Sequence, residues 1–196
     1  GEFMPGQGWY APSLRSDQEA GVAHWSQADI VALLQNGVSP SGHASGPMAE
    51  VVFGSTQYLS TEDLQAMASY LQGLKAEPVD EASVAPAKAA VLQRGGKIYE
   101  QRCADCHGVQ GQGVAAVYPA LAGNRAVTLT PITNLVRTVE RGGFAPSTAG
   151  NPRPYGMPPF GHALSNRDIA DVLSFVRQSW GNQAQEVSEL EVMQAR

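Results

Sequence analysis

The sequence predicts an all-α protein in which one complete helical domain follows the latter part of another. Apolar spacing and helix-capping signals mark five segments, and no segment alternates apolar and polar residues convincingly enough to predict a strand. One helical pattern also occurs twice along the chain. The predicted helices cover 27–36, 61–73, 88–103, 131–141 and 166–178.

Residues 1–75 repeat a pattern found later in the chain. The matching segments are 29–37 with 134–142, 59–64 with 164–169, and 46–48 with 156–158. The first pair ends at Gly37 and Gly142, each placed like a helix C-cap. In the second pair, a serine followed three residues later by an aspartate predicts a capping box for the next helix. We therefore interpret residues 1–75 as the back half of a second domain of the same kind.

A Pro- and Ala-rich linker over 76–90 is expected to join this half to the complete domain, residues 91–180. Thr130 and Pro131 give the fourth helix a cap and a proline in its first turn. The last predicted helix carries an apolar stripe, formed by Ile169, Val172, Leu173 and Val176.

The tail, residues 181–196, carries Val187, Leu190 and Met193 at three-residue steps. This spacing predicts a short amphipathic segment that packs along a domain or a partner. A frayed terminus is the alternative.

Charge and hydropathy exclude two classes of function. The chain has 13 Lys and Arg against 18 Asp and Glu, a net charge of -5, so it offers no basic surface for a phosphate backbone. No stretch approaches the ~20 apolar residues of a membrane span. We expect neither a nucleic-acid partner nor a transmembrane span in this chain.

The only two cysteines lie in Cys103–His107, which has the C-x-x-C-H spacing of covalent haem c attachment. Two thiols one helical turn apart can each form a thioether with a haem vinyl group, while the adjoining imidazole faces iron. A zinc site would need further Cys or His ligands, and a thioredoxin-like pair would need a βαβ setting. A plain disulfide would leave His107 without a role. The motif predicts one haem c bound by Cys103, Cys106 and His107.

Met157 is the predicted second ligand of the iron. It lies in a loop segment followed by Pro158 and Pro159, whose fixed φ angles stiffen the chain. A thioether held in this way can reach iron without a large ordering cost, and methionine raises the reduction potential relative to histidine. Alternatively, Met157 only fills a gap in the packing. His162 is the alternative ligand.

The residues before the haem motif resemble those of a class I cytochrome c. Gly95, Tyr99 and Cys103 recur at four-residue steps along the predicted helix. The resemblance implies that Gly95 allows the C-terminal helix to cross closely and that Tyr99 packs into the crossing.

The residues after the motif carry the resemblance further, because 118–124 is similar to the loop that follows the haem in that family. It implies that the Pro119 carbonyl orients the proximal histidine and that Leu121 packs on the haem. Arg125 and Arg153 are candidates for pairing with the haem propionates because guanidinium suits carboxylates, and solvated surface arginines are the alternative. Tyr155 is counted among the cofactor-binding residues.

Four further segments extend the likeness over nearly the whole chain: Gly8–Leu14, Trp25–Ile30, Gly46–Val52 and Ser179–Asn182. They are similar to the C-terminal part of the three-haem cytochrome c subunit of membrane-bound alcohol, gluconate and aldehyde dehydrogenases. Because thioethers to haem form after export of the chain, we expect a periplasmic protein, and the resemblance implies a parent at the outer face of the inner membrane. The parent would pass electrons from a quinoprotein or flavoprotein dehydrogenase to ubiquinone.

This sequence departs from that pattern because it lacks the first domain and the second C-x-x-C-H. Met48 would then be the distal ligand of a haem that the chain cannot bind covalently. We expect residues 1–75 to be a truncated domain. A haem-free domain reused as a cap, with Met48 in its core, is the alternative.

These observations predict an electron-transfer protein, not an enzyme in itself. The expected partners are a catalytic dehydrogenase subunit and ubiquinone or another redox protein. Peripheral membrane association or a domain-swapped oligomer would fit the same interpretation. Two other classes compete with it: a ligand-binding or peroxide-reactive haem protein with a labile distal methionine, and an interaction module that docks a dehydrogenase subunit.

Overall fold

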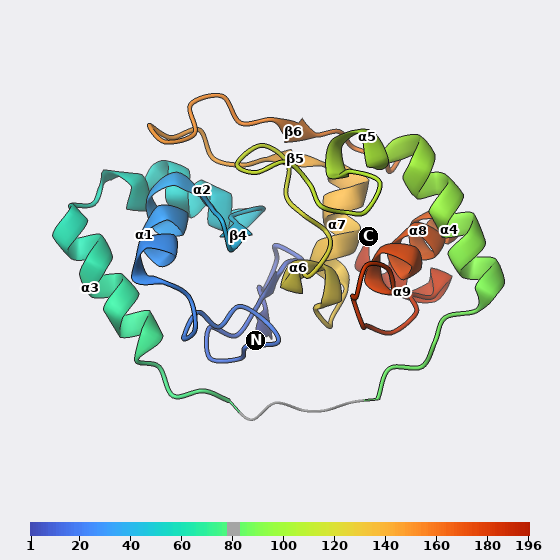
Figure 1. The fold of residues 1–196 in the computed structure, drawn as a ribbon, viewed down its shortest axis with the longest axis horizontal. Coiled ribbons are helices and arrows are strands. Elements are labelled where there is room, and N and C mark those ends of the chain that lie inside the picture. The colour runs from blue at the N-terminus through green and yellow to red at the C-terminus, as the bar shows by residue number, and fades with distance from the viewer. Residues whose placement is uncertain (78–82) are drawn as a thin grey trace.

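The computed structural model describes residues 1–77 and 83–196, and these are mostly helical (Figure 1). The helices are α1 (Gln27–Asn36), α2 (Pro47–Gly54), α3 (Thr61–Gln72), α4 (Ala89–Arg102), α5 (Ala104–His107), α6 (Arg125–Thr128), α7 (Thr133–Arg141), α8 (Asn166–Arg177) and α9 (Glu189–Ala195), with a 3₁₀ turn η1 (Thr56–Tyr58). All five predicted helices are present, as α1, α3, α4, α7 and α8, and each bound lies within two residues of the prediction. Part of the predicted linker, 78–82, lies outside the described residues.

Three short antiparallel ribbons were not predicted. Strand β1 (Glu2–Phe3) pairs with β2 (Tyr10–Ala11), β3 (Val38–Ser39) with β4 (Gly42–His43), and β5 (Gly143–Phe144) with β6 (Gly156–Met157). Each strand has two residues, so no alternation of apolar and polar residues can develop along it. The ribbons join helices and do not form a sheet core.

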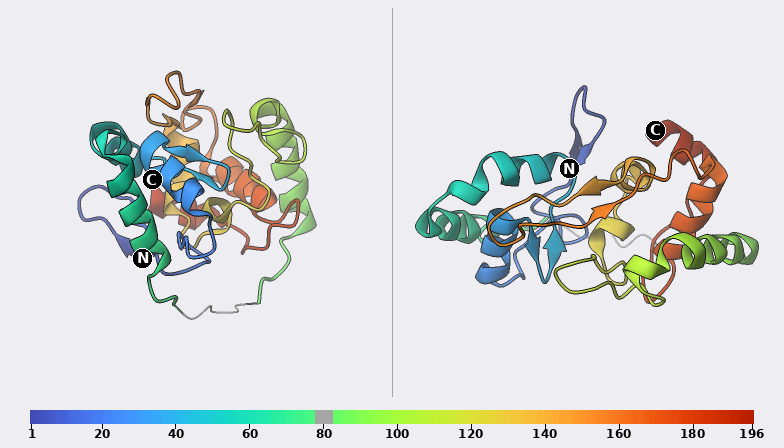
Figure 2. Two further views of the ribbon diagram at one scale, coloured as in Figure 1. Left: turned by 60° about the vertical axis from the view of Figure 1, so that its left-hand side comes forward. Right: turned by 90° about the horizontal axis from the view of Figure 1, so that it is seen from above.

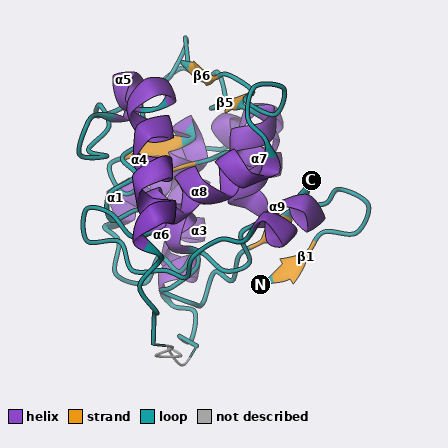
Figure 3. Cartoon of the chain, turned by 90° about the vertical axis from the view of Figure 1, so that its right-hand side faces the viewer, coloured by secondary structure: helices purple, strands orange, loops and turns teal. Residues whose placement is uncertain are grey.

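Helices α4 and α8 cross closely at Gly95. A Cβ atom built there would collide with the backbone carbonyl of Asp171, so a side chain at this position would push the helices apart. Beside the crossing, Arg94 Nη2 donates to Asp171 Oδ1 at 2.8 Å. Tyr99, which is 3% exposed, packs against the ring of Phe175 at 5.5 Å between centroids. This crossing holds the end of α4, where the haem motif begins (Figure 3).

The tail folds back as α9 and covers the groove between α7 and α8. Val187, Val192 and Ala195 are buried in the core cluster of these helices. Leu190 and Met193 are 56% and 57% exposed, so the predicted apolar face was wrong in its register. Ser188 and Glu191 form a capping box that starts the helix.

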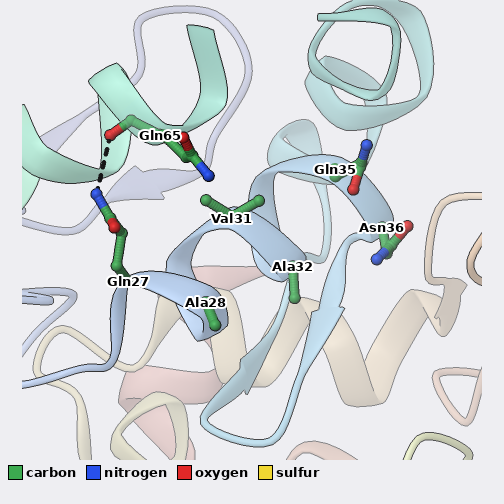
Figure 4. A pocket seen from close by; sticks show the side chains of 7 residues that line it. All are labelled: Gln27, Ala28, Val31, Ala32, Gln35, Asn36 and Gln65. Atoms are coloured by element: carbon green, nitrogen blue, oxygen red, sulfur yellow. Dashed lines mark hydrogen bonds between the residues drawn. The ribbon is translucent and has the colours of Figure 1, made fainter. Parts of the chain in front are cut away.

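The first part of the chain packs α1 on α3 around its own apolar cluster of Val22, Ile30, Leu34, Leu64 and Ala68. Where α9 covers the second part, the first part has an open groove of ≈ 370 Å³, lined by both amide and small apolar side chains (Figure 4). There the Gln27 side-chain amide donates to the backbone carbonyl of Gln65 at 3.3 Å. Glutamines thus occupy positions where the second part has the apolar Ile132 and Ala170.

The two parts of the chain contact each other directly. Asn134 on α7 brackets the main chain of Tyr10: its Nδ2 donates to the carbonyl at 2.7 Å, and its Oδ1 accepts from the N–H at 2.9 Å. The loop between β5 and β6 reaches the first part, where Thr148 Oγ1 donates to the Asn36 carbonyl at 3.2 Å (Figures 1 and 2). Within 1–77 and 83–196, no helix combines the length and the apolarity needed to cross a membrane.

Candidate functional site

The two cysteines and His107 share one helical turn. Helix α4 ends at Arg102, and Cys103 opens the four-residue helix α5, in which the His107 N–H donates to the Cys103 carbonyl at 2.9 Å. Both cysteines are free thiols, and both are half-buried. The local backbone therefore brings two sulfur atoms and one imidazole together at one end of α4.

Cys103 lies against an apolar wall. It packs on the buried cluster of Tyr99, Val127, Val172 and Val176. Burial, and secondarily the neighbouring charge of Cys106, raises the pKa of the Cys103 thiol to about 11. At neutral pH the group is therefore a thiol and not a reactive thiolate.

His107 is held in one orientation by its own loop. Its Nδ1 lies 2.9 Å from the carbonyl oxygen of Pro119. A carbonyl oxygen can only accept, so Nδ1 carries the proton and Nε2 keeps a free lone pair. Burial lowers the pKa of the imidazole, although the bond to Pro119 acts in the opposite direction. The ring is therefore neutral at pH 7, which is the form that ligates metals.

Hydrogen bonds to Gly111 and Asn182, together with the packing of Leu121, hold the loop that carries Pro119 in place. The Leu121 N–H donates to the Gly111 carbonyl at 2.7 Å, and half-buried Leu121 packs against the same cluster as Cys103. Buried Asn182 donates through Nδ2 to the Leu121 carbonyl at 2.9 Å and accepts from the Gly123 N–H at 2.8 Å. Asn182 thus positions this loop, and sequence reasoning gave it no such role.

Met157 lies in β6, in register with Gly143 of β5. Its side chain is half-buried, and its backbone carbonyl occupies the space where a Cβ of Gly142 would lie. Gly142 also has a φ of 64°, in the left-handed region that favours glycine. This glycine therefore permits the turn from α7 into the ribbon that carries Met157.

Tyr155 connects the Met157 segment to the loop after the motif. Its ring packs on that of Tyr118, with 5.3 Å between centroids and 58° between planes. The Tyr118 backbone pairs with that of Val114: its N–H donates to the Val114 carbonyl at 2.9 Å, and its carbonyl accepts from the Val114 N–H at 2.9 Å. Sequence reasoning counted Tyr155 among the site residues and missed Tyr118.

The two arginines have different surroundings. Arg125 is half-buried, and its Nη1 donates to the carbonyl oxygens of Asp17 at 3.0 Å and Gly21 at 2.6 Å. Its guanidinium lies 5.4 Å from the ring centroid of Trp25. Its polar contacts therefore reach the first part of the chain. Arg153 is exposed.

The two methionines matched by sequence lie in different elements. Met157 is a strand residue, whereas Met48 belongs to the first turn of α2 and is 38% exposed. The strand that corresponds to β6 is β4, which carries Gly42–His43. His162, the alternative ligand, is exposed after the Met157 segment.

Comparison with known proteins identifies the family. A family model described as cytochrome c matches residues 92–180. Cytochrome c-554(548) of Halomonas halodenitrificans is 37% identical over 73 residues, which cover 37% of this chain and 78% of that protein. The chain belongs to the cytochrome c family.

Longer relatives match almost the whole of this cytochrome c. The cytochrome c subunit of alcohol dehydrogenase (quinone) from Gluconacetobacter polyoxogenes is 38% identical over 189 residues, covering 92% of this chain and 40% of that protein. The gluconate 2-dehydrogenase cytochrome c subunit of Pantoea cypripedii is 35% identical over 193 residues, covering 94% and 44%. The chain therefore spans about two fifths of the length of these relatives.

Membership of the family implies covalently bound haem c, and the residues present fit that group. Cys103 and Cys106 are unpaired thiols at the required spacing, and their sulfurs stand for the two thioether sulfurs. The tautomer of His107 leaves Nε2 free to bind iron. The apolar wall beside Cys103 suits a porphyrin edge.

Proposed function

We propose that this cytochrome c transfers electrons through a single haem c attached to Cys103 and Cys106, with iron held between His107 and Met157. When bound, haem supplies one-electron exchange between ferrous and ferric iron. The observation that carries the proposal is the hydrogen bond from His107 to Pro119 beside two free thiols. The protein alone therefore holds a metal-binding imidazole next to the two thiols that would attach the haem.

The residues around the site each have a stated task in this proposal. The Pro119 carbonyl accepts a hydrogen bond from Nδ1–H of His107, which orients the imidazole and makes its Nε2 lone pair a better ligand for iron. Leu121 adds apolar cover beside Cys103. Met157 supplies a neutral sulfur ligand, which favours the ferrous state and raises the potential relative to a second histidine. Arg153 and Arg125 remain candidates for the propionates.

We also propose where the electrons come from and go to. The relatives are named as cytochrome c subunits of a quinone-dependent alcohol dehydrogenase and of gluconate 2-dehydrogenase. The chain would serve in such a subunit on the periplasmic side of the membrane. It would receive electrons from a quinoprotein or flavoprotein dehydrogenase and pass them toward ubiquinone, without binding the dehydrogenase substrate itself.

Residues 1–75 fit the latter half of a second cytochrome-like domain. The two parts have the same order of elements. The first has α1, Gly37, the β3–β4 ribbon and the Ser60-capped α3, and the second has α7, Gly142, the β5–β6 ribbon and the Ser165-capped α8. Ala66, Met67 and Tyr70 of α3 are exposed at the positions that Asp171, Val172 and Phe175 hold in α8. A haem-free cap that packs on the complete domain is the competing interpretation.

Replacing Met157 by Ala tests the proposed ligand pair. In the wild-type ferric protein we expect a near-infrared absorption band of iron–thioether ligation that cyanide leaves unchanged, and we expect the reduced protein not to bind carbon monoxide. Met157→Ala should abolish the band and lower the reduction potential, whereas His162→Ala, the matched control, should leave both unchanged. A band that survives in Met157→Ala rules out Met157. Ready binding of carbon monoxide by the reduced wild type would favour a ligand-binding haem protein.

A further inference from the structure

We propose that Tyr118 and Tyr155 form an aromatic clasp that holds the Met157 segment against the loop that orients His107. The proposal rests on the ligation of iron by His107 and Met157 described above. It gives the two tyrosines a positioning role, because neither is a ligand. The clasp consists of these two residues only.

The position of each tyrosine in the chain makes the contact informative. Tyr118 directly precedes Pro119, whose carbonyl binds the imidazole of His107. Tyr155 comes two residues before Met157, at the end of the loop that joins β5 to β6. A contact between the two rings therefore links the segment on the histidine side of the site to the segment on the methionine side.

The geometry is that of a specific ring pair. The centroids are 5.3 Å apart and the planes are inclined by 58°, within the range of favourable tilted and edge-to-face pairs. Tyr118 is itself anchored, because its backbone carbonyl accepts from the Val114 N–H at 2.9 Å and its N–H donates to the Val114 carbonyl at 2.9 Å. The anchored ring is therefore Tyr118, and Tyr155 is the ring it holds.

Because Tyr155 is largely exposed, replacing it tests the ring contact without disturbing the packing of the core. The residue is 62% exposed, so truncating it removes little buried surface. Most surface substitutions change stability only slightly. A ring pair of this kind is worth enough to change the equilibrium between a held and a released Met157 segment by about three- to tenfold. Release of that segment would open the iron to an external ligand.

Imidazole binding to the ferric, haem-loaded full chain tests the clasp. Tyr155→Ala should lower the apparent Kd for imidazole about three- to tenfold and weaken the near-infrared thioether band. Tyr155→Phe keeps the ring and should restore the wild-type values. Tyr70→Ala, which removes a ring that is 70% exposed on α3, is the matched control and should change nothing. Tyr155→Leu repeats the test should the alanine variant fail to fold.

The outcomes separate the clasp from the ligation on which it rests. An unchanged imidazole Kd in both Tyr155→Ala and Tyr155→Leu overturns the clasp while the wild-type band leaves Met157 ligation intact. The clasp is also overturned if Tyr155→Phe fails to restore the wild-type Kd for imidazole, or if Tyr70→Ala lowers that Kd as much as Tyr155→Ala does. A wild-type protein without the band overturns both the ligation and the clasp.

Discussion

Asn134 binds the main chain of Tyr10 through both atoms of its amide, at 2.7 and 2.9 Å, across 124 positions of sequence. The pair fastens the N-terminal segment to α7 of the complete domain. Asn134→Ala removes both bonds and leaves two half-buried backbone groups unsatisfied. We expect the free energy of unfolding to fall by about 1–3 kcal/mol and the Tyr10 amide to exchange faster with deuterium.

The neighbouring Thr133→Ala is the control for Asn134, because Thr133 is half-buried at the start of the same helix. Unfolding and amide exchange in Thr133→Ala should stay near the wild-type values. Equal exchange of the Tyr10 amide in Asn134→Ala and the wild type would show that this contact does not hold the N-terminal segment.

Arg125 provides a second link, in which one guanidinium binds two carbonyls and lies over Trp25. Arg125→Ala should therefore destabilise the protein by about 1–3 kcal/mol and expose the segment around Trp25 to protease. Arg125→Lys should not restore stability, because an ammonium group cannot reproduce a planar donor that also stacks. Pairing of Arg125 with a propionate would be favoured instead if Arg125→Ala shifted the reduction potential strongly without changing stability, and Arg125→Lys restored the potential.

The long helices were predictable because their signals are local. Ser60 and Ser165 accept from the N–H groups of Asp63 and Asp168, as the Ser-x-x-Asp pattern indicated, and the apolar face of α8 is buried as its spacing required. Helix α9 also carried a readable signal, the Ser188–Glu191 capping box. The amphipathic segment predicted in the tail does pack on the domain, but apolar residues at three-residue steps suggested the wrong face of it.

The orientation of Arg125 could not be predicted in the same way. It depends on where the first part of the chain packs, and no local pattern encodes that position. The same limit applies to Asn182, whose partner Leu121 lies 61 residues away in the chain. It also applies to Tyr118, whose partner Tyr155 lies 37 residues away. The attachment motif was predictable because its chemistry is contained within five consecutive residues.

Gly95 tests the helix crossing that holds the motif. Gly95→Ala places a methyl group against the Asp171 carbonyl, and the resulting shift of the helices should cost about 1–3 kcal/mol of unfolding free energy. Gly96→Ala is the matched control, because the nearest neighbour of its Cβ would be the Phe175 ring, at 3.2 Å. Its helix propensity gain, roughly 0.5–1 kcal/mol, offsets that contact. Chemical denaturation of both variants checks the difference, and equal losses would contradict a close crossing at Gly95.

Asp168 should make α8 sensitive to acid. Hydrogen bonds from Ser165 lower the pKa of the Asp168 carboxyl below its ordinary value. The stabilisation is therefore complete above the unfolded pKa, about 3.9, and is lost as the pH falls through the lower folded value. The carboxyl is partly exposed, so we expect less than about 1 kcal/mol. Asp168→Asn should lose this pH dependence in acid denaturation, and a profile identical to the wild type would refute it.

The intact mass of the denatured protein tests the central claim, which is covalent attachment of one haem to Cys103 and Cys106. The protein should be expressed in a host that matures a co-expressed control cytochrome c. We predict a mass equal to the polypeptide plus one haem, and the bare polypeptide mass when both cysteines are replaced by alanine. A wild-type chain that emerges at the bare polypeptide mass, beside a fully loaded control, would contradict the account.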